Sequence, residues 1–181
     1  PYGETQLVEQ MFNNYAKPGC TFATVIDSFN WRNFIFEVAP KFKQRLIDSG
    51  ARWGFRPDSG DAIKTPVQVI RDLATVFGYS KNEFGFKVLN DVFCIQGDGI
   101  GPEEVTKIIE ALIVDGWCVS NIVFGMGGGL LQKNNRDTQK FAMKCCAVLV
   151  GDNWIDVYKD PAVFNEDTWE VLDVPSFKKS K

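Results

Sequence analysis

The sequence of 181 residues contains no histidine. Histidine is the commonest general base and the commonest zinc ligand, so its absence argues against a Ser-His-Asp triad or a zinc site within this chain. The five cysteines include no C-x-x-C pair. Their odd number and their apolar neighbours predict buried, reduced thiols rather than a disulfide framework.

A long apolar run and an excess of basic residues are missing too. No stretch approaches the roughly 18 apolar residues that a membrane span needs, and the N-terminus lacks a signal-peptide pattern. The net charge of −3 argues against nucleic acid as the main partner. We therefore expect a cytoplasmic protein that binds neither membrane nor nucleic acid, with enough apolar content (45%) for one ordinary core.

Short apolar runs alternate with helical patterns along the chain. Hydrophobic periodicity and its breakers predict helices at 4–16, within 29–49 with a break near Pro40, from a Thr65-Pro66 capping box to Gly78, and from Pro102 to Gly116. Strands are predicted at 20–26, 51–55, 92–95 and 121–124. Such spacing implies right-handed crossovers and a parallel α/β sheet, either open or closed into a barrel.

Two of these helices carry a clear apolar stripe, and the chain changes character after residue 140. The stripes consist of Val69, Ile70, Leu73, Val76 and Phe77 in one helix, and of Val105, Ile108, Ile109, Leu112 and Ile113 in the other. Residues 141–158 predict a β-hairpin that turns at Gly151-Asp152-Asn153. The last twenty residues predict loop.

Polar or glycine-rich clusters follow the four predicted strands. These clusters lie at 27–28, 56–60, 97–99 and 125–133. In a parallel sheet the carboxyl ends of strands meet at one edge, where ligands bind. The glycine run at 127–129 lets backbone N–H groups approach an anion. The clusters therefore predict one site, suited to a phosphorylated sugar.

Each cluster also has a simpler structural interpretation. The R-P-D-S-G segment makes a good turn, in which Arg56 pairs with Asp58 at the surface. Asp27 is a suitable helix cap, and Gly97-Asp98-Gly99 contains a common turn dipeptide. Arg136, Lys144 and Lys159 taken singly fit a solvated basic face.

Three carboxylates favour the ligand interpretation. Asp27, Asp58 and Asp98 would repel one another at one sheet edge unless something positive or rich in hydroxyl groups lay between them. Ribose hydroxyls and hydrated Mg²⁺ meet that need, and Arg56 offers a bidentate fork for phosphate.

Five motifs of this chain share their order and spacing with one family. They lie at 54–60 (G-F-R-P-D-S-G), 95–99 (I-Q-G-D-G), 124–133 (F-G-M-G-G-G-L-L-Q-K), 136–137 and 159–161. Over about residues 20–161 the chain resembles the nicotinamide phosphoribosyltransferases, of the type II phosphoribosyltransferase family. The resemblance implies part of a TIM-like (β/α) barrel with a C-terminal β-hairpin. It also implies synthesis of nicotinamide mononucleotide and pyrophosphate from nicotinamide and 5-phosphoribosyl 1-pyrophosphate. Mg²⁺ and a homodimer with active sites at its interface are further implications.

The resemblance assigns roles by position. Asp27, Arg56 and Asp58 would be catalytic, with Asp27 and Asp58 orienting Mg²⁺ through water. Substrate binding would fall to Arg56 and Asp58 together with Gly97, Asp98, Gly127, Gly128, Arg136, Lys144 and Lys159. The last three resemble a basic cluster contributed across the dimer.

The chain also departs from the family pattern. The family's Glu-His-Ser segment, whose phosphorylated histidine couples ATP hydrolysis, is absent, as is the upstream half of the nicotinamide pocket. We expect residues 1–140 to be barrel units and 141–181 a hairpin and loop of the same domain, in a fragment inactive alone. Nicotinate phosphoribosyltransferase and a non-catalytic phosphate-sugar binding domain remain the alternatives.

Overall fold

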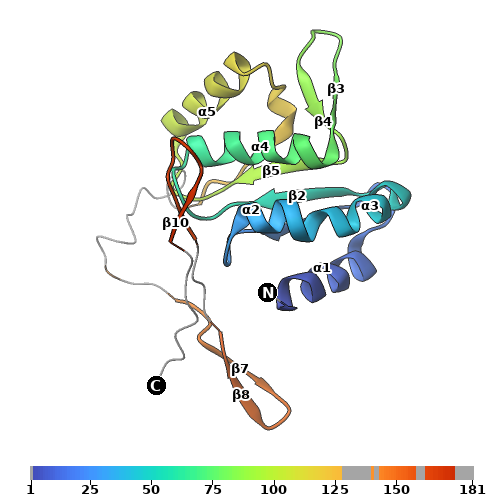
Figure 1. Ribbon diagram of the computed structural model, residues 1–181, viewed down its shortest axis with the longest axis vertical. Coiled ribbons are helices and arrows are strands. Elements are labelled where there is room, and N and C mark those ends of the chain that lie inside the picture. The colour runs from blue at the N-terminus through green and yellow to red at the C-terminus, as the bar shows by residue number, and fades with distance from the viewer. Residues whose placement is uncertain (1, 128–139, 141–142, 158–161, 174–181) are drawn as a thin grey trace.

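The computed structural model describes residues 2–127, 140, 143–157 and 162–173. Within them the chain is mixed α/β, and its main sheet has four strands in the order β1-β2-β5-β6 (Figure 1). Its elements in chain order are α1 (Tyr2–Tyr15), β1 (Thr21–Val25), α2 (Trp31–Asn33), α3 (Lys43–Ser49), β2 (Arg52–Arg56), α4 (Lys64–Phe77), β5 (Val92–Gln96), α5 (Pro102–Val114) and β6 (Ile122–Phe124). The predicted strands and helices are confirmed to within a few residues.

All three pairings in the main sheet are parallel, and the strands follow one another in sequence order. Right-handed crossovers that always step in one direction place their helices on one face of the sheet. Contacts of α1 with β1, of α4 with β5 and of α4 with α5 agree with this arrangement. The arrowheads of β2 and β5 in Figure 1 point to the same end of the molecule, so the carboxyl ends of the strands share one edge.

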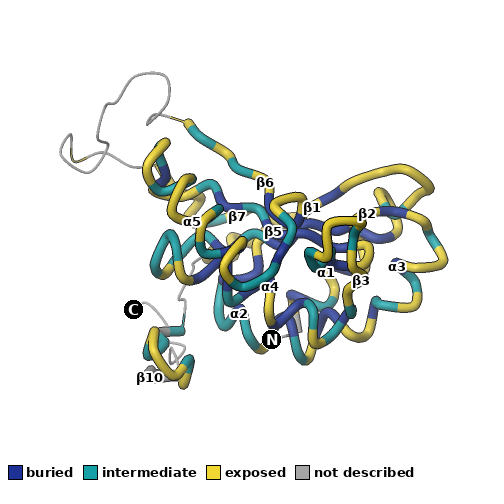
Figure 2. Tube along the Cα trace, turned by 90° about the horizontal axis from the view of Figure 1, so that it is seen from above, coloured by how far each residue is buried: buried dark blue, intermediate teal, exposed yellow. Residues whose placement is uncertain are grey.

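The two faces of the sheet differ in burial. In β1, Phe22 and Thr24 are buried, whereas the alternate residues Thr21, Ala23 and Val25 are exposed. The strand register places the buried residues of β1 on the same face as Trp53, Phe55, Cys94 and Ile122. It places the exposed residues of β1 on the same face as Gly54, Arg56, Ile95 and Val123. We call these sets the helix face and the open face. Figure 2 shows the buried residues concentrated in the strands and the adjoining sides of the helices.

Trp53 lies at the centre of the core on the helix face. Its side chain is fully buried, and its indole Nε1 donates a hydrogen bond of 2.9 Å to Thr24 Oγ1. Six phenylalanine rings surround it. Four come from helical segments and two from β1 and β2: Phe12, Phe34, Phe42, Phe77, Phe22 and Phe55. This cluster joins the helical layer to the sheet through apolar burial and edge-to-face ring contacts.

The predicted break within residues 29–49 is confirmed. Between α2 and α3 the chain forms a π-helical turn (Phe34–Val38) and then a 3₁₀ turn (Ala39–Phe42) that contains Pro40. Proline lacks the N–H group needed to continue an α-helix, so the hydrogen-bond pattern changes around it. Gly50, at φ +64°, ends α3 in the left-handed conformation that glycine adopts without strain.

The predicted capping box at Thr65 is wrong. Helix α4 begins one residue earlier, and the Oδ1 of Asp61 accepts hydrogen bonds from the N–H groups of Ile63 and Lys64. Thr65 is instead buried at the start of the helix. The α4 stripe is confirmed except that Val76 is only partly buried. In α5, Ile108 and Leu112 are buried, but Ile113 is 47% exposed, so that stripe is narrower than predicted.

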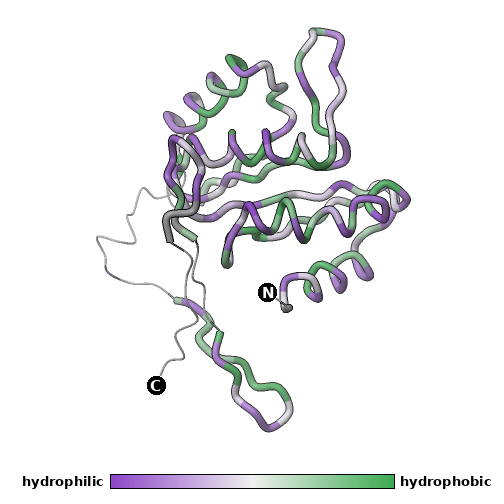
Figure 3. The backbone as a smooth tube through the Cα atoms, viewed as in Figure 1, coloured by the Kyte–Doolittle hydropathy of each residue, from purple (hydrophilic) through white to green (hydrophobic). Residues whose placement is uncertain are grey.

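Three hairpins complete the described chain. The hairpin β3–β4 (Tyr79–Lys81 and Lys87–Leu89), which the sequence did not reveal, follows α4. The hairpin β7–β8 (Ala147–Val150 and Asn153–Asp156) confirms the predicted turn and projects from the body with largely hydrophobic strands (Figures 1 and 3). The hairpin β9–β10 (Val163–Phe164 and Val171–Asp173) contradicts the prediction that the C-terminal segment is only loop.

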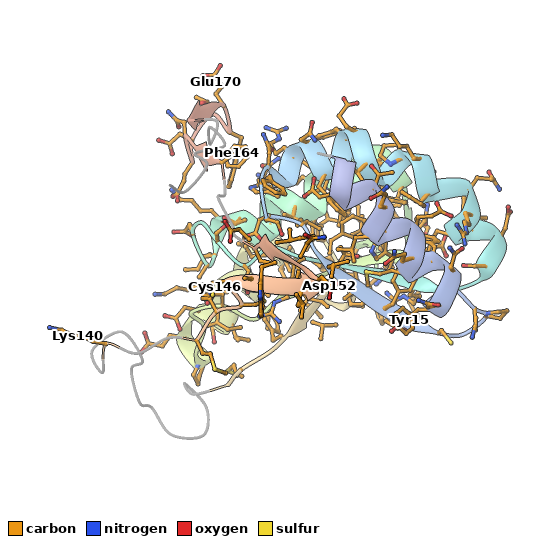
Figure 4. The ribbon with its side chains drawn as sticks, turned by 90° about the horizontal axis from the view of Figure 1, so that it is seen from below. Tyr15, Lys140, Cys146, Asp152, Phe164 and Glu170 are labelled. Atoms are coloured by element: carbon orange, nitrogen blue, oxygen red, sulfur yellow. The ribbon has the colours of Figure 1, made fainter. Side chains whose placement is uncertain are left out.

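The hairpin β9–β10 is held by aromatic packing. Phe164 and Trp169 contact the buried Trp31 at ring-centroid distances of 5.2 and 5.6 Å. Arg32 Nη1 donates a hydrogen bond of 3.1 Å to the carbonyl of Trp169. These contacts join segments far apart in sequence and place the hairpin at the edge where the parallel strands end (Figures 1 and 4).

The cysteines are free, as predicted, but their predicted burial is mostly wrong. Cys94 is buried and Cys118 partly buried, whereas Cys20, Cys145 and Cys146 are exposed. No helix among the described residues is long and apolar enough to cross a membrane.

Candidate functional site

The candidate site lies where β1, β2 and β5 end. A hydrogen bond of 3.1 Å from Ile26 N to the Arg56 carbonyl extends the pairing of β1 and β2 to their last residues. A second, of 2.9 Å from Gly125 N to the Gln96 carbonyl, does the same for β5 and β6. The polar clusters that follow these strands are therefore brought to one edge, as parallel pairing predicts.

Arg56, the last residue of β2, interacts with Asp58 two residues later. Its Nε and Nη2 donate to Asp58 Oδ1 at 3.2 and 2.9 Å. The side chains are 41% and 32% exposed, so both groups remain accessible to a ligand. The surface pair of the structural interpretation is thus present, and it lies at the predicted site. Two of the five guanidinium N–H donors face Asp58, which leaves others for an anion.

Asp27 follows β1 and is almost completely buried, with 1% of its surface exposed. Its Oδ2 accepts a hydrogen bond of 2.9 Å from the backbone N–H of Asp58 and another from the hydroxyl of Ser59. A buried carboxylate needs such charge-assisted bonds to offset its lost hydration. Asp27 therefore joins the end of β1 to the turn that follows β2.

Gly97 brings the end of β5 close to Arg56. A Cβ atom at this position would lie 3.4 Å from Arg56 Nη2 and 3.6 Å from the Gly125 carbonyl oxygen. The guanidinium thus packs beside bare backbone on the open face. Two residues earlier on β2, a Cβ on Gly54 would lie 2.7 Å from the Phe93 ring. Glycine at this position therefore permits the ring to pack closely against the backbone.

Gln96 and Ser59 contribute to the site but were not among the predicted site residues. Gln96 is 4% exposed, and its Nε2 donates to the carbonyls of Ala62 and Asp98 at 2.9 and 3.4 Å. Its signal in the sequence is a polar side chain that ends an otherwise apolar strand. Ser59 donates to Asp27, which only the three-dimensional pairing of β1 and β2 could indicate.

The remaining predicted site residues lie beyond the strand ends or outside the described residues. Asp98 and Gly127 are exposed beyond the ends of β5 and β6. Lys144 is exposed just before β7, and it has no ion pair or hydrogen bond with another described residue. Gly128, Arg136 and Lys159 lie outside the described residues.

A cavity of about 360 Å³ adjoins the site on the side of the hairpin β9–β10. Its lining residues are Ser59, Gly60, Thr65, Ala162, Phe164, Glu166 and Trp169. Arg56, Asp58 and Asp98 are not among them, so these charged groups do not line the cavity.

The site has few groups suited to nucleophilic attack. Burial raises the pKa of the Cys94 thiol, so this residue of β5 stays protonated and is a poor nucleophile. The part of the chain that the structure describes contains no cluster of three or more metal-ligating side chains. The arrangement is suited to binding and orienting an anionic, hydroxyl-bearing molecule.

Comparison with known proteins gives consistent similarities. The model of the nicotinate phosphoribosyltransferase (NAPRTase) family matches residues 4–170. A nicotinamide phosphoribosyltransferase of Xanthomonas campestris pv. campestris is 45% identical over 159 residues, which are 87% of this chain and 34% of that protein. One from Mycoplasma pneumoniae is 34% identical over 173 residues, 88% of this chain and 38% of that protein.

The chain therefore spans about a third of the length of these relatives. The family match nevertheless covers nearly all of the chain, including every strand of the main sheet and the ends of β1, β2 and β5. On this basis, the chain belongs to the nicotinate phosphoribosyltransferase family.

Proposed function

We propose that the full-length polypeptide containing this chain is a nicotinamide phosphoribosyltransferase. It would transfer the phosphoribosyl group of 5-phosphoribosyl 1-pyrophosphate to nicotinamide, giving nicotinamide mononucleotide and pyrophosphate. The observation that carries the proposal is the joining of Asp27, Arg56 and Asp58 at the ends of two adjacent parallel strands. The name shared by the relatives supports the choice of substrate.

We further propose that the sheet is part of a (β/α) barrel. Its sequential parallel strands and helices on one face support this, since four β/α units are half of an eight-stranded barrel. The open face, where Val25 and Val123 are 43% and 49% exposed, would then line the barrel interior. Residues 1–140 would supply barrel units, and residues 141–181 the hairpin region of the same domain.

Arg56 and the carboxylates would hold different parts of the sugar phosphate. The N–H donors of Arg56 that do not face Asp58 would bind phosphate, next to the bare backbone of Gly97. Asp58 and the exposed Asp98 would accept hydrogen bonds from ribose hydroxyls. Gly127 and Gly128 would let backbone N–H groups approach the 5′-phosphate. Arg136, Lys144 and Lys159 would add positive charge, across a homodimer interface.

The transfer breaks the bond between ribose C1 and the pyrophosphate oxygen and forms a bond from C1 to the nicotinamide ring nitrogen. Pyrophosphate leaves with the electron pair of the broken bond, so stabilisation of its charge would be the dominant catalytic effect. The ring nitrogen has a lone pair and needs no general base. A chain without histidine is compatible with this chemistry.

Mg²⁺ is the cofactor that we propose, bound mainly by the pyrophosphate group of the substrate. Mg²⁺ prefers one or two carboxylates together with water and phosphate oxygens. Of the two carboxylates predicted for the ion, the partly exposed Asp58 suits that role, whereas Asp27 is buried, and the exposed Asp98 is a further candidate. The ion would neutralise the leaving group. ATP coupling would require a histidine in another part of the polypeptide, because this chain has none.

An assay of the full-length protein tests the proposal. Purified protein with 5-phosphoribosyl 1-pyrophosphate and Mg²⁺ is given nicotinamide in one reaction and nicotinate in a matched reaction. We expect mononucleotide from nicotinamide at a kcat/KM well above that for nicotinate. Preference for nicotinate would favour the acid-specific enzyme that the family description names, and no product from either would favour a non-catalytic binding domain.

A further inference from the structure

The loop between β2 and α4, residues 57–63, is held on two sides by buried polar side chains. From β1, Asp27 Oδ2 accepts hydrogen bonds from the Asp58 N–H and the Ser59 hydroxyl. From β5, Gln96 Nε2 donates to the carbonyl of Ala62. The loop that carries Asp58 is thus fixed near both its ends by neighbouring strands.

Both side chains are well placed for positioning and poorly placed for substrate contact. Asp27 is 1% exposed and Gln96 4% exposed, in contrast to the 32% exposure of Asp58. A buried polar side chain that gave up its hydrogen bonds to reach a ligand would leave buried donors or acceptors unsatisfied. In holding the loop, the same side chains keep these hydrogen bonds.

The geometry of Asp27 also fits Mg²⁺ coordination poorly. Its Oδ2 already accepts from two donors of the loop, and the carboxylate is out of contact with solvent. Mg²⁺ keeps several waters of hydration and binds few carboxylates directly, so it needs a more open site. Asp58, two residues beyond the end of β2, is better exposed.

We propose that Asp27 and Gln96 are positioning residues that clamp the loop 57–63, and that Asp27 acts through Ser59 and the Asp58 amide without touching Mg²⁺ or substrate. The clamp sets Arg56 and Asp58 against the end of β5. Gln96 Nε2 also donates to the backbone carbonyl of Asp98 at 3.4 Å, so the same side chain contacts the backbone of both loops. The inference rests on the proposed function.

The test for Asp27 uses the full-length protein with Asp27→Asn, Asp27→Ala and Asp58→Asn. Asparagine keeps an oxygen that can accept from both donors, whereas alanine removes it. We expect Asp27→Ala to lower kcat about hundredfold, the loss that a small misplacement of reacting groups can cause. Asp27→Asn should recover most of that loss. Calorimetric Mg²⁺ affinity in the presence of pyrophosphate should be unchanged in Asp27→Asn and reduced in Asp58→Asn.

Gln96→Glu tests the second half of the clamp, because a carboxylate cannot donate to the carbonyls of Ala62 and Asp98. We expect kcat to fall about tenfold to hundredfold, as for other residues that orient a site, with a smaller change in KM. The matched control is Gln10→Glu, which makes the same chemical change at an exposed position of α1 and should leave kcat unaltered.

Amide hydrogen exchange at Asp58 distinguishes failure of the clamp from failure of the proposed function. Exchange should accelerate in Ser59→Ala and Asp27→Ala relative to Gln10→Glu. Unchanged exchange, or weaker Mg²⁺ binding in Asp27→Asn, would overturn the clamp even in an active enzyme. A wild-type protein that forms no mononucleotide but shows the expected exchange would contradict the proposed function alone.

Discussion

The two faces of the parallel sheet carry different residues for different purposes. The helix face holds Trp53 and its ring of phenylalanines, all buried. The open face ends in Arg56, and its β1 residues Ala23 and Val25 are exposed, although Phe93 of β5 is buried there against Gly54. The same strands thus stabilise the fold with one set of residues and leave the other set accessible, at the edge where we propose that the ligand binds.

The contrast teaches that packing and chemistry are separated by the alternation of side chains along a strand. Successive residues of a strand point to opposite faces, so Phe55 can anchor the core while Arg56 faces the site. Substitutions on the helix face should therefore change stability. Substitutions at the end of the open face should change turnover and leave stability nearly unaltered.

Asp58→Ala should have the largest effect. In the full-length protein we expect kcat for the proposed reaction to fall by at least about hundredfold to thousandfold, comparable to the loss of one key electrostatic group. The free energy of unfolding should change by less than about 1 kcal/mol, because the side chain is partly exposed and its ion pair with Arg56 is near the surface. Steady-state kinetics and urea unfolding measure the two quantities. Normal turnover in Asp58→Ala would remove this residue from the site.

Trp53→Ala should give the opposite pattern. Removing this fully buried ring should lower the free energy of unfolding by about 3–5 kcal/mol, the usual cost of deleting a large core side chain. The control is Phe84→Ala, which truncates an aromatic residue that is 78% exposed and should cost less than about 0.5 kcal/mol. Equal losses in the two variants, measured by urea unfolding, would contradict the assigned core.

Arg56→Lys should weaken substrate binding and spare the fold. A lysine ammonium keeps the charge but cannot present two parallel donors. We expect the Kd for 5-phosphoribosyl 1-pyrophosphate to rise about tenfold to hundredfold, corresponding to the loss of one charge-assisted hydrogen bond. Calorimetry on the full-length protein measures this change. An unaltered Kd would leave Arg56 as a structural partner of Asp58 only.

Asp72→Asn should give the smallest effect, visible as a change with pH. Burial raises the pKa of Asp72 on α4, although Gln68, Arg32 and Arg71 partly oppose the shift. The folded state holds this proton more tightly than the unfolded state does. The stabilisation that protonated Asp72 provides is therefore complete below the pKa of a free aspartate, about 4. It is lost as pH rises through the higher folded pKa. The Asn variant should lose less stability than wild type over that rise, as unfolding curves at several pH values would show. An identical pH dependence would contradict the raised pKa.

Much of this arrangement could be predicted from local pattern. The strand ends that carry Asp27, Arg56 and Asp58 were identified because apolar runs, turn residues and helical periodicity alternate regularly. Parallel pairing then required the three residues to share an edge. The break near Pro40 and the end of α3 at Gly50 followed from the backbone limits of proline and glycine.

Two failures came from interactions between distant segments, and one from a choice between two nearby capping residues. The hairpin β9–β10 is ordered by contacts of Phe164 and Trp169 with Trp31, which no local pattern indicates. The start of α4 was misplaced because Asp61, rather than Thr65, supplies the capping oxygen, and both residue types are good caps. Ser59 is also positioned by a distant residue, because its partner Asp27 follows β1, whereas Ser59 follows β2.

A crystal structure of the full-length protein with 5-phosphoribosyl 1-pyrophosphate and Mg²⁺ would test the central claim most directly. We predict the sugar phosphate at the carboxyl ends of β2 and β5, with Arg56 on a phosphate oxygen and Asp58 on the ribose or a metal-bound water. Asp27 should still accept from Ser59. A ligand bound elsewhere, or one that leaves Arg56 and Asp58 untouched, would contradict the assignment of chemistry to the open face.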